Sequence, residues 1–75
     1  MTRYANLGSD SGIASYEIAD ESITVEFKNG SVYLYTYESA GPSNVEEMKF
    51  LAQAGEGLNA FINRTVRDQY ASRLR

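Results

Sequence analysis

Alternating apolar and polar positions mark two successive strands in the first half of the chain. Every second residue from 23 to 27 is apolar, and residues 31–37 alternate in the same way. Asn29-Gly30 separates the two runs, and this dipeptide favours a two-residue type I′ turn, in which both central residues adopt positive φ. The pattern therefore predicts a β-hairpin.

The length of that turn sets the register of the hairpin. A two-residue loop pairs Lys28 with Ser31 and divides the side chains between two faces. The face expected to pack on the core carries Ile23, Val25, Phe27, Val32, Leu34 and Thr36. The face expected to point outward carries Tyr33, Tyr35 and Tyr37. A shift of one residue would exchange the faces of one strand.

An earlier strand is expected between Ala14 and Ala19. If Asp20-Glu21 is a tight turn, this strand runs antiparallel to the next one. Three pairs are then opposite one another: Ile18 and Ile23, Tyr16 and Val25, and Ala14 and Phe27. The result is a three-stranded antiparallel meander in the order 1-2-3.

Helical spacing replaces alternation after Gly41-Pro42. Ser43 with Glu46, or Asn44 with Glu47, has the spacing of a capping box. One stripe of the helix carries Val45, Met48, Leu51 and Ala52. Glycines 55 and 57 are expected to end this helix.

A second helix is expected from about Leu58 to about Leu74. Its apolar side carries Leu58, Phe61, Ile62, Thr65, Val66 and Tyr70. The order of elements predicts an α+β fold, a βββαα two-layer sandwich with both helices on one face of the sheet. Residues 1–12 are expected to form a flexible N-terminal segment, and residues 13–75 a single domain.

Composition excludes several classes of chemistry. The 75 residues include neither Cys nor His, which removes thiolate and imidazole metal ligands, disulfides and the usual nucleophile–base pairs. We therefore expect no enzyme, no metal and no cofactor. The chain has neither a long apolar run nor a basic start followed by one, so we expect a cytoplasmic protein without membrane contact.

The order of these features resembles the KTSC domain family, short bacterial domains that are also appended to some lysyl-tRNA synthetases. The resemblance rests on Ser11-Gly12-Ile13, Tyr16, Ile23-Thr24-Val25-Glu26-Phe27, Asn29-Gly30, Tyr33-Leu34-Tyr35, Gly57-Leu58-Asn59-Ala60-Phe61-Ile62, Val66-Arg67 and Tyr70. It covers most of the chain, from about residue 11 to residue 70. The company of a tRNA synthetase implies an association with RNA metabolism.

The tyrosine row Tyr33, Tyr35 and Tyr37 is the first candidate surface. Three outward tyrosines are more apolar area than solubility requires, which is typical of a docking platform for a second copy or another protein. Stacking of RNA bases is a second interpretation, although Glu17 and Glu26 on the same face would repel phosphates. Ordinary cross-strand packing is the third.

The predicted last helix and the first helix each add a candidate. Arg64, Arg67 and Arg75 cluster opposite the buried stripe of the last helix, where they would contact phosphates or simply form a solvated face. Phe50 is opposite the apolar stripe of the first helix, so it either packs on the second helix or is an exposed anchor for a partner.

Together these features predict a small non-catalytic interaction domain that self-associates through its sheet as a homodimer, or binds another protein. The alternative is an RNA-associated accessory module that contacts phosphates through its C-terminal helix.

Overall fold

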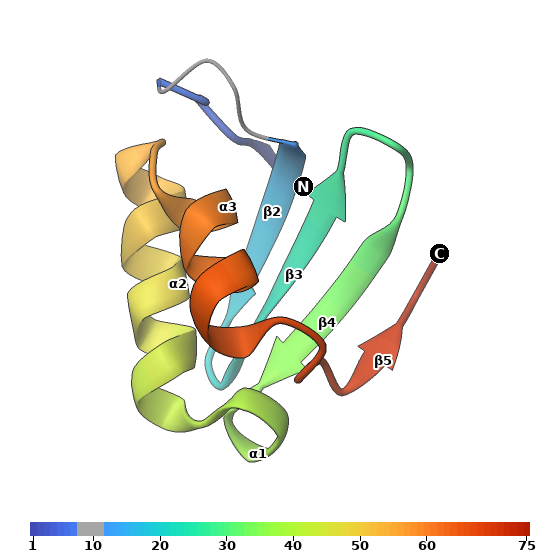
Figure 1. The fold of residues 1–75 in the computed structure, drawn as a ribbon, viewed down its shortest axis with the longest axis vertical. Coiled ribbons are helices and arrows are strands. Elements are labelled where there is room, and N and C mark those ends of the chain that lie inside the picture. Colours follow the sequence, from blue (N-terminus) through green and yellow to red (C-terminus); the bar gives the residue numbers. More distant parts are fainter. Residues whose placement is uncertain (8–11) are drawn as a thin grey trace.

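The computed structural model describes residues 1–7 and 12–75. An antiparallel sheet in the order β1-β2-β3-β4-β5 forms one layer, and helices cover one of its faces (Figure 1). The strands are β1 (Thr2–Arg3), β2 (Ile13–Ala19), β3 (Ser22–Phe27), β4 (Val32–Thr36) and β5 (Ser72–Arg73). The helices are α1 (Tyr37–Ala40), α2 (Pro42–Ala54), α3 (Leu58–Phe61) and the π-helical turn η1 (Ile62–Val66).

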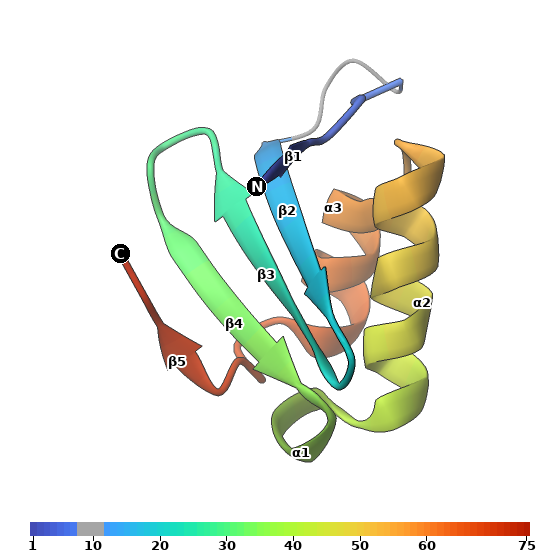
Figure 2. The ribbon, with the colours of Figure 1, turned by 180° about the vertical axis from the view of Figure 1, so that it is seen from behind.

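The α+β class and the antiparallel meander are confirmed, but three strands were too few. The two-residue strands β1 and β5 extend the meander at its two edges. Seen from behind, the strands face the viewer, α3 lies beyond them and α2 is at their right (Figure 2). The sheet therefore has one covered and one open face.

The register between β2 and β3 agrees with the sequence over the turn-proximal half. Ile18 is opposite Ile23 and Tyr16 is opposite Val25, as expected. The pairing then shifts, so that Ile13 rather than Ala14 is opposite Phe27. This β-bulge turns Ile13 into the core, where it is 1% exposed.

The register between β3 and β4 differs from the expected one by one residue. Val25 is opposite Tyr33 and Ile23 is opposite Tyr35. The connection is a three-residue loop closed by the Phe27 amide, which donates to the Ser31 carbonyl at 2.8 Å. Within this loop, only the glycine has positive φ, 94°. That is a turn followed by a left-handed bulge residue rather than a type I′ turn.

The shift reverses the two faces of β4. The tyrosines of this strand point toward the helices, whereas Val32 and Leu34 are opposite Glu26 and Thr24 on the other face. The prediction that Val32, Leu34 and Thr36 share the core face is therefore wrong.

A short helix that the sequence pattern did not suggest follows β4 directly. Thr36 caps α1, because its hydroxyl accepts from the Ser39 amide at 3.0 Å and the Ser39 hydroxyl accepts from the Thr36 amide. The capping box is thus here and not at the start of α2, which begins with Pro42 after Gly41. Tyr37, expected in the strand, is the first residue of α1.

The helix α2 agrees with the sequence in its buried stripe and in its end. Val45, Met48 and Ala52 are buried, and Leu51 is half-buried. Gly55 ends the helix in the left-handed conformation, at φ 81°.

The second predicted helix is much shorter than expected. It is continuous from α3 into η1 and ends at Val66, eight residues before Leu74. The amide of Arg67 donates to the Ile62 carbonyl five residues earlier, the spacing of a π-helix. Arg67 then adopts φ 43°, and the chain turns back toward β4.

Residues 2–4 pair with the sheet and pack against the core. Thr2 pairs with Tyr16 in the sheet, and Tyr4 is 3% exposed. The Tyr4 hydroxyl accepts a hydrogen bond from the Leu58 amide at the start of α3. Of the predicted flexible segment, residues 8–11 lie outside the described residues, and with them the Ser11 of the family resemblance.

Candidate functional site

An aromatic cluster occupies the edge of the covered face, between β4 and the chain that leaves η1. The rings of Phe27 and Tyr33 meet edge to face at 5.7 Å between centroids. Tyr70 packs on Tyr33 at 4.6 Å and on Tyr35 at 6.2 Å. These separations are in the range in which aromatic pairs attract.

The end of η1 brings Tyr70 to the cluster. Because the helix ends at Val66 and Arg67 reverses the chain, the following residues run back along β4. The Ala71 amide donates to the Leu34 carbonyl at 2.7 Å, and β5 then pairs with β4. Residues 67–75 therefore form a strap along the edge of β4, with Tyr70 near its start.

Tyr35 of β4 holds the start of this strap through a hydrogen bond. Its ring is 2% exposed, and its hydroxyl donates to the Arg67 carbonyl at 3.1 Å. Burial, with the neighbouring groups Tyr33, Tyr70 and Asp68, raises the pKa of Tyr35 from 10.0 to about 12. The phenol is consequently a neutral hydrogen-bond donor at physiological pH.

The cluster forms one wall of an open pocket of about 600 Å³, which we call the aromatic pocket. Its lining comprises Phe27, Tyr33, Tyr35, Ile62, Asn63, Arg67, Asp68 and Tyr70. Asn63, Arg67 and Asp68 are exposed and supply the polar rim. The guanidinium of Arg73 is 5.5 Å from the centroid of the Tyr33 ring, a cation–π contact at the same edge.

The expected outward tyrosine row does not exist. Tyr35 is buried beneath the helices, Tyr33 is half-buried in the aromatic cluster, and Tyr37 belongs to α1. The face assignment was wrong because the loop has three residues rather than two, which turns β4 over. Tyr33 and Tyr35 nevertheless line a pocket, so the structure places them at a different candidate site.

The expected arginine face is also absent, because the helix that would carry it ends at Val66. Arg64 is in η1 and Arg67 follows it, whereas Arg75 is beyond β5. Arg75 forms an ion pair with Glu26 at 2.8 Å and donates to the Gly30 carbonyl at 3.2 Å. Of the three, only Arg67 lines the aromatic pocket.

Phe50 is an exposed side chain of α2. It is 65% exposed, so the interpretation in which it packs on the second helix is wrong. The helical repeat places it opposite the buried residues Val45, Met48 and Ala52. The acidic residues Glu46 and Glu47 precede it by one turn.

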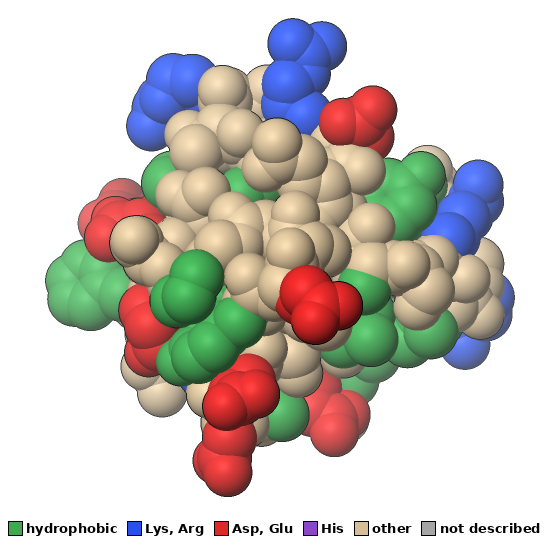
Figure 3. Space-filling model, turned by 90° about the horizontal axis from the view of Figure 1, so that it is seen from below, with side chains coloured by type: hydrophobic (Ala, Val, Ile, Leu, Met, Phe, Trp, Pro, Cys, Tyr) green, Lys and Arg blue, Asp and Glu red, His purple; other side chains and the backbone are tan. Residues whose placement is uncertain are grey.

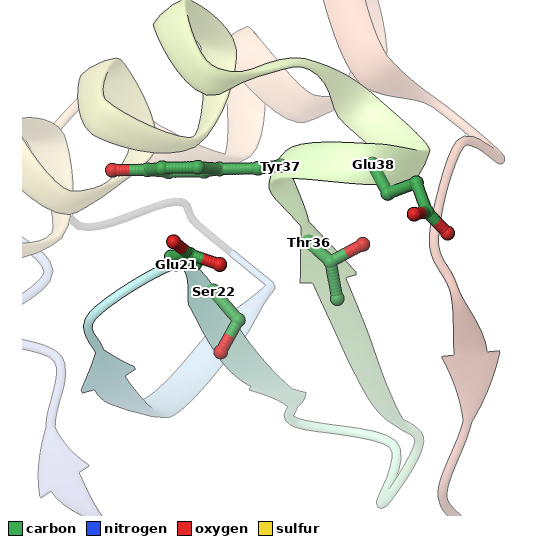
Figure 4. Close-up of a pocket in the computed structure, with 5 residues that line it drawn as sticks. All are labelled: Glu21, Ser22, Thr36, Tyr37 and Glu38. Atoms are coloured by element: carbon green, nitrogen blue, oxygen red, sulfur yellow. The ribbon is translucent and has the colours of Figure 1, made fainter.

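A second open depression, of about 610 Å³, is between the start of β3 and α1 (Figure 4). The Tyr37 ring extends along it toward α2 on the side of Glu21, while Glu38 points to the opposite side. The Tyr37 hydroxyl donates to Glu46 at 2.5 Å, and Lys49 donates to the same carboxylate at 2.9 Å.

These bonds fix the charge state of the tyrosine and its partner. The hydrogen bond with Glu46 raises the pKa of Tyr37, and the bonds from Tyr37 and Lys49 lower the pKa of Glu46. The acidic side chains that line the depression itself are Glu21 and Glu38. Within residues 1–7 and 12–75, no group of three or more acidic side chains is placed to hold a metal ion.

Charge is segregated over the surface as well as along the chain. Seen from the side of α1, most Asp and Glu side chains are at the centre, left and lower part of the molecule, and Lys and Arg lie along the upper and right margins, with one acidic side chain among them at the top (Figure 3). Residues 1–58 hold three basic and nine acidic side chains, whereas residues 59–75 hold four arginines and Asp68. The aromatic pocket is at the basic end of the chain.

Sequence reasoning did not identify the aromatic pocket. It placed Phe27 on the core face, where the structure has it packed against the core, and it placed Tyr70 on the buried side of a helix that ends before this residue. Arg73 was not singled out, since a two-residue edge strand leaves no periodic signal.

No family model, curated protein or solved structure matches this chain. The resemblance to the KTSC family therefore stays a prediction. In the part of the chain that the structure describes, every helix is too short or too polar to cross a membrane.

Proposed function

We propose that this chain is a small non-catalytic interaction domain that self-associates through the aromatic pocket. The observation that carries the proposal is the open space of about 600 Å³ beside Tyr33 and Tyr70, with Arg67 at its rim. Aromatic and arginine side chains are the residue types that contribute most to protein interfaces. The tyrosines still support docking, but at a pocket on the sheet edge instead of the open sheet face.

The three polar groups with a shifted pKa keep their ordinary charge state at neutral pH. General acids and bases work best when their pKa is near the operating pH. The three resolved shifts go the other way: the pKa of Tyr35 and Tyr37 rises above 10.0 and that of Glu46 falls below 4.5. Each group is thereby held in its ordinary charge state at neutral pH.

Small size and mixed charge support self-association. A chain this short buries only about 60% of its unfolded surface, so covering further apolar area stabilises it. Its acidic α2 and its arginine-rich C-terminal part can attract each other between copies.

Sedimentation velocity over a range of concentrations tests the proposal. We expect an average mass that rises with concentration, and Arg67→Glu to weaken the association because it puts an acid at the pocket rim. Lys28→Glu makes the same charge change at an exposed residue of the β3–β4 loop and is the control. A wild-type chain that stays monomeric up to about 1 mM would refute self-association.

The RNA-associated alternative is still supported by the family resemblance. It is no longer supported by a shared helix face of Arg64, Arg67 and Arg75. A monomeric chain that binds a structured RNA, with an affinity that falls as salt rises and falls again in Arg64→Ala/Arg67→Ala, would put this alternative in place of self-association.

A further inference from the structure

We propose that the aromatic pocket of one copy receives the Phe50 side chain of a second copy, so that the molecules join head to tail. This inference rests on the proposed function and names the partner of the same site. Both halves of the contact are present on a single chain: an exposed aromatic ring on α2 and an open pocket with aromatic walls.

Phe50 has the properties of an anchor. It is the most exposed aromatic side chain in the described part of the chain, at 65%, and it points away from the core on a regular helix of 13 residues. A ring on a helix is already held in position, so little further order is lost when it is buried. Transfer of a phenylalanine ring from water into a pocket is among the larger single contributions to association.

The aromatic pocket has the size and walls for one such ring. The Tyr33 ring already contacts Phe27 at 5.7 Å and Tyr70 at 4.6 Å between centroids, and an inserted ring would extend that cluster. Tyr35 is buried behind these rings, and its hydroxyl donates to the Arg67 carbonyl. An apolar guest in the pocket therefore does not leave the Tyr35 hydroxyl without a hydrogen-bond partner.

The charges around the two halves are complementary. Glu46 and Glu47 are one turn before Phe50 on α2; Glu46 is paired with Lys49, so Glu47 carries the charge that is available to a partner. Arg67 is on the pocket rim and Arg73 is over the Tyr33 ring, with Asp68 as the acidic side chain of the lining. Opposite charges that meet at the rim of an interface set its orientation and speed association more than they add affinity.

The placement of the two halves determines the kind of assembly. The helix α2 and the strand β5 lie at opposite sides of the molecule (Figure 1). Because the two elements lie on opposite sides, one contact leaves a free ring at one end and a free pocket at the other. Further copies then add as an open chain or, where the rotation allows, as a closed ring. The assembly therefore grows with concentration, and one ring in one pocket makes each contact weak.

A complementation experiment tests this contact directly. Phe50→Ser removes the anchor and keeps the pocket, and Arg67→Glu repels the acidic helix from the pocket and keeps the anchor. By sedimentation velocity, each variant alone should need at least about tenfold higher concentration than the wild type to associate. Mixed in equal amounts, the two variants should form a 1:1 complex that does not grow further, because only one anchor and one pocket remain functional.

Each outcome bears on the inference. A 1:1 complex in the mixture shows that both variants are folded and that anchor and pocket meet. If Phe50→Ser associates as strongly as the wild type, self-association stands but the Phe50 contact is wrong. If both variants keep the wild-type circular dichroism spectrum and their mixture stays monomeric, the head-to-tail contact is also wrong. A monomeric wild type removes the proposed function itself.

Discussion

The hydroxyl of Tyr35 donates a hydrogen bond to the main-chain carbonyl of Arg67 at 3.1 Å, and this bond ties β4 to the end of η1. The two residues are 32 positions apart in the sequence. The bond holds the start of the strap next to the strand, and with it one wall of the aromatic pocket.

Removal of this hydroxyl should destabilise the fold modestly. Tyr35→Phe keeps the buried ring but leaves the Arg67 carbonyl without its donor, so the free energy of unfolding in urea should fall by about 1 kcal/mol. Tyr33→Phe is the matched control, because Tyr33 is half-buried in the same cluster. Its effect should stay within about 0.5 kcal/mol. Equal losses in the two variants would show that the Tyr35 bond is not special.

The raised pKa of Tyr35 predicts a loss of stability in alkaline solution. The folded chain holds this proton up to about pH 12, whereas the unfolded chain releases it near 10.0. The unfolded state therefore binds fewer protons above pH 10, and stability falls as the pH rises toward 12.

The Tyr35→Phe variant and a titration of the tyrosines test this pH dependence. The stability advantage of the wild type over Tyr35→Phe should narrow between about pH 10 and about pH 12. Of the six tyrosines, Tyr35 and Tyr37 should titrate late in phenolate absorbance, and Tyr35→Phe should remove the step near pH 12. Loss of a step near pH 10 instead would contradict the burial of this phenol.

The pairing of β2 with β3 could be predicted because only one register satisfied the alternation of apolar residues. In the β2–β3 pair, Ile18 meets Ile23 and Tyr16 meets Val25 as the pattern required. The buried stripe and glycine end of α2 were equally clear, since helical spacing and a left-handed terminus point to the same boundaries.

The register of β4 could not be decided in the same way. Both faces of this strand are apolar, one with Val32 and Leu34 and the other with Tyr33 and Tyr35, so neither face identifies the core. An Asn-Gly sequence also fits two loop lengths, with Gly30 either inside a two-residue turn or as a left-handed bulge residue. Because the register of β4 was predicted wrongly, the sequence did not reveal the aromatic pocket.

The end of the second helix was hidden for a different reason. Residues up to Tyr70 keep helical spacing, and neither Gly nor Pro marks a stop after Val66. Arg67 supplies the positive φ that a glycine would usually supply. The end of the helix is fixed by two long-range contacts, the Tyr35 hydrogen bond and the pairing of β5 with β4. The local sequence does not encode either contact.

The backbone of Arg67 should therefore be a site of stored strain. Its φ of 43° with ψ of −110° is unfavourable for a residue with a Cβ. Arg67→Gly should raise the free energy of unfolding by up to about 1 kcal/mol. Arg64→Gly, inside η1, should lower it by about 0.5–1 kcal/mol, since glycine only weakens a helix there. A destabilised Arg67→Gly would mean that the arginine side chain contributes more than its backbone costs.

The glycine of the β3–β4 loop offers a test of the loop type. Gly30 has φ 94° and open space around it, so Gly30→Ala should cost about 1–2 kcal/mol through backbone strain alone. Gly12 has equally open space without a positive φ in that range, and Gly12→Ala should be close to neutral. Urea unfolding compares the two, and an unchanged Gly30→Ala would rule out the left-handed residue at this position.

The aromatic pocket, the strap and the proposed contact all depend on the register of β4 against β3. NMR measures this register most directly. The structure predicts contacts between the α protons of Thr24 and Leu34, and of Glu26 and Val32, with a Tyr35 ring protected from solvent. Contacts between the α protons of Val25 and Leu34, with a solvent-exposed Tyr35 ring, would contradict the account.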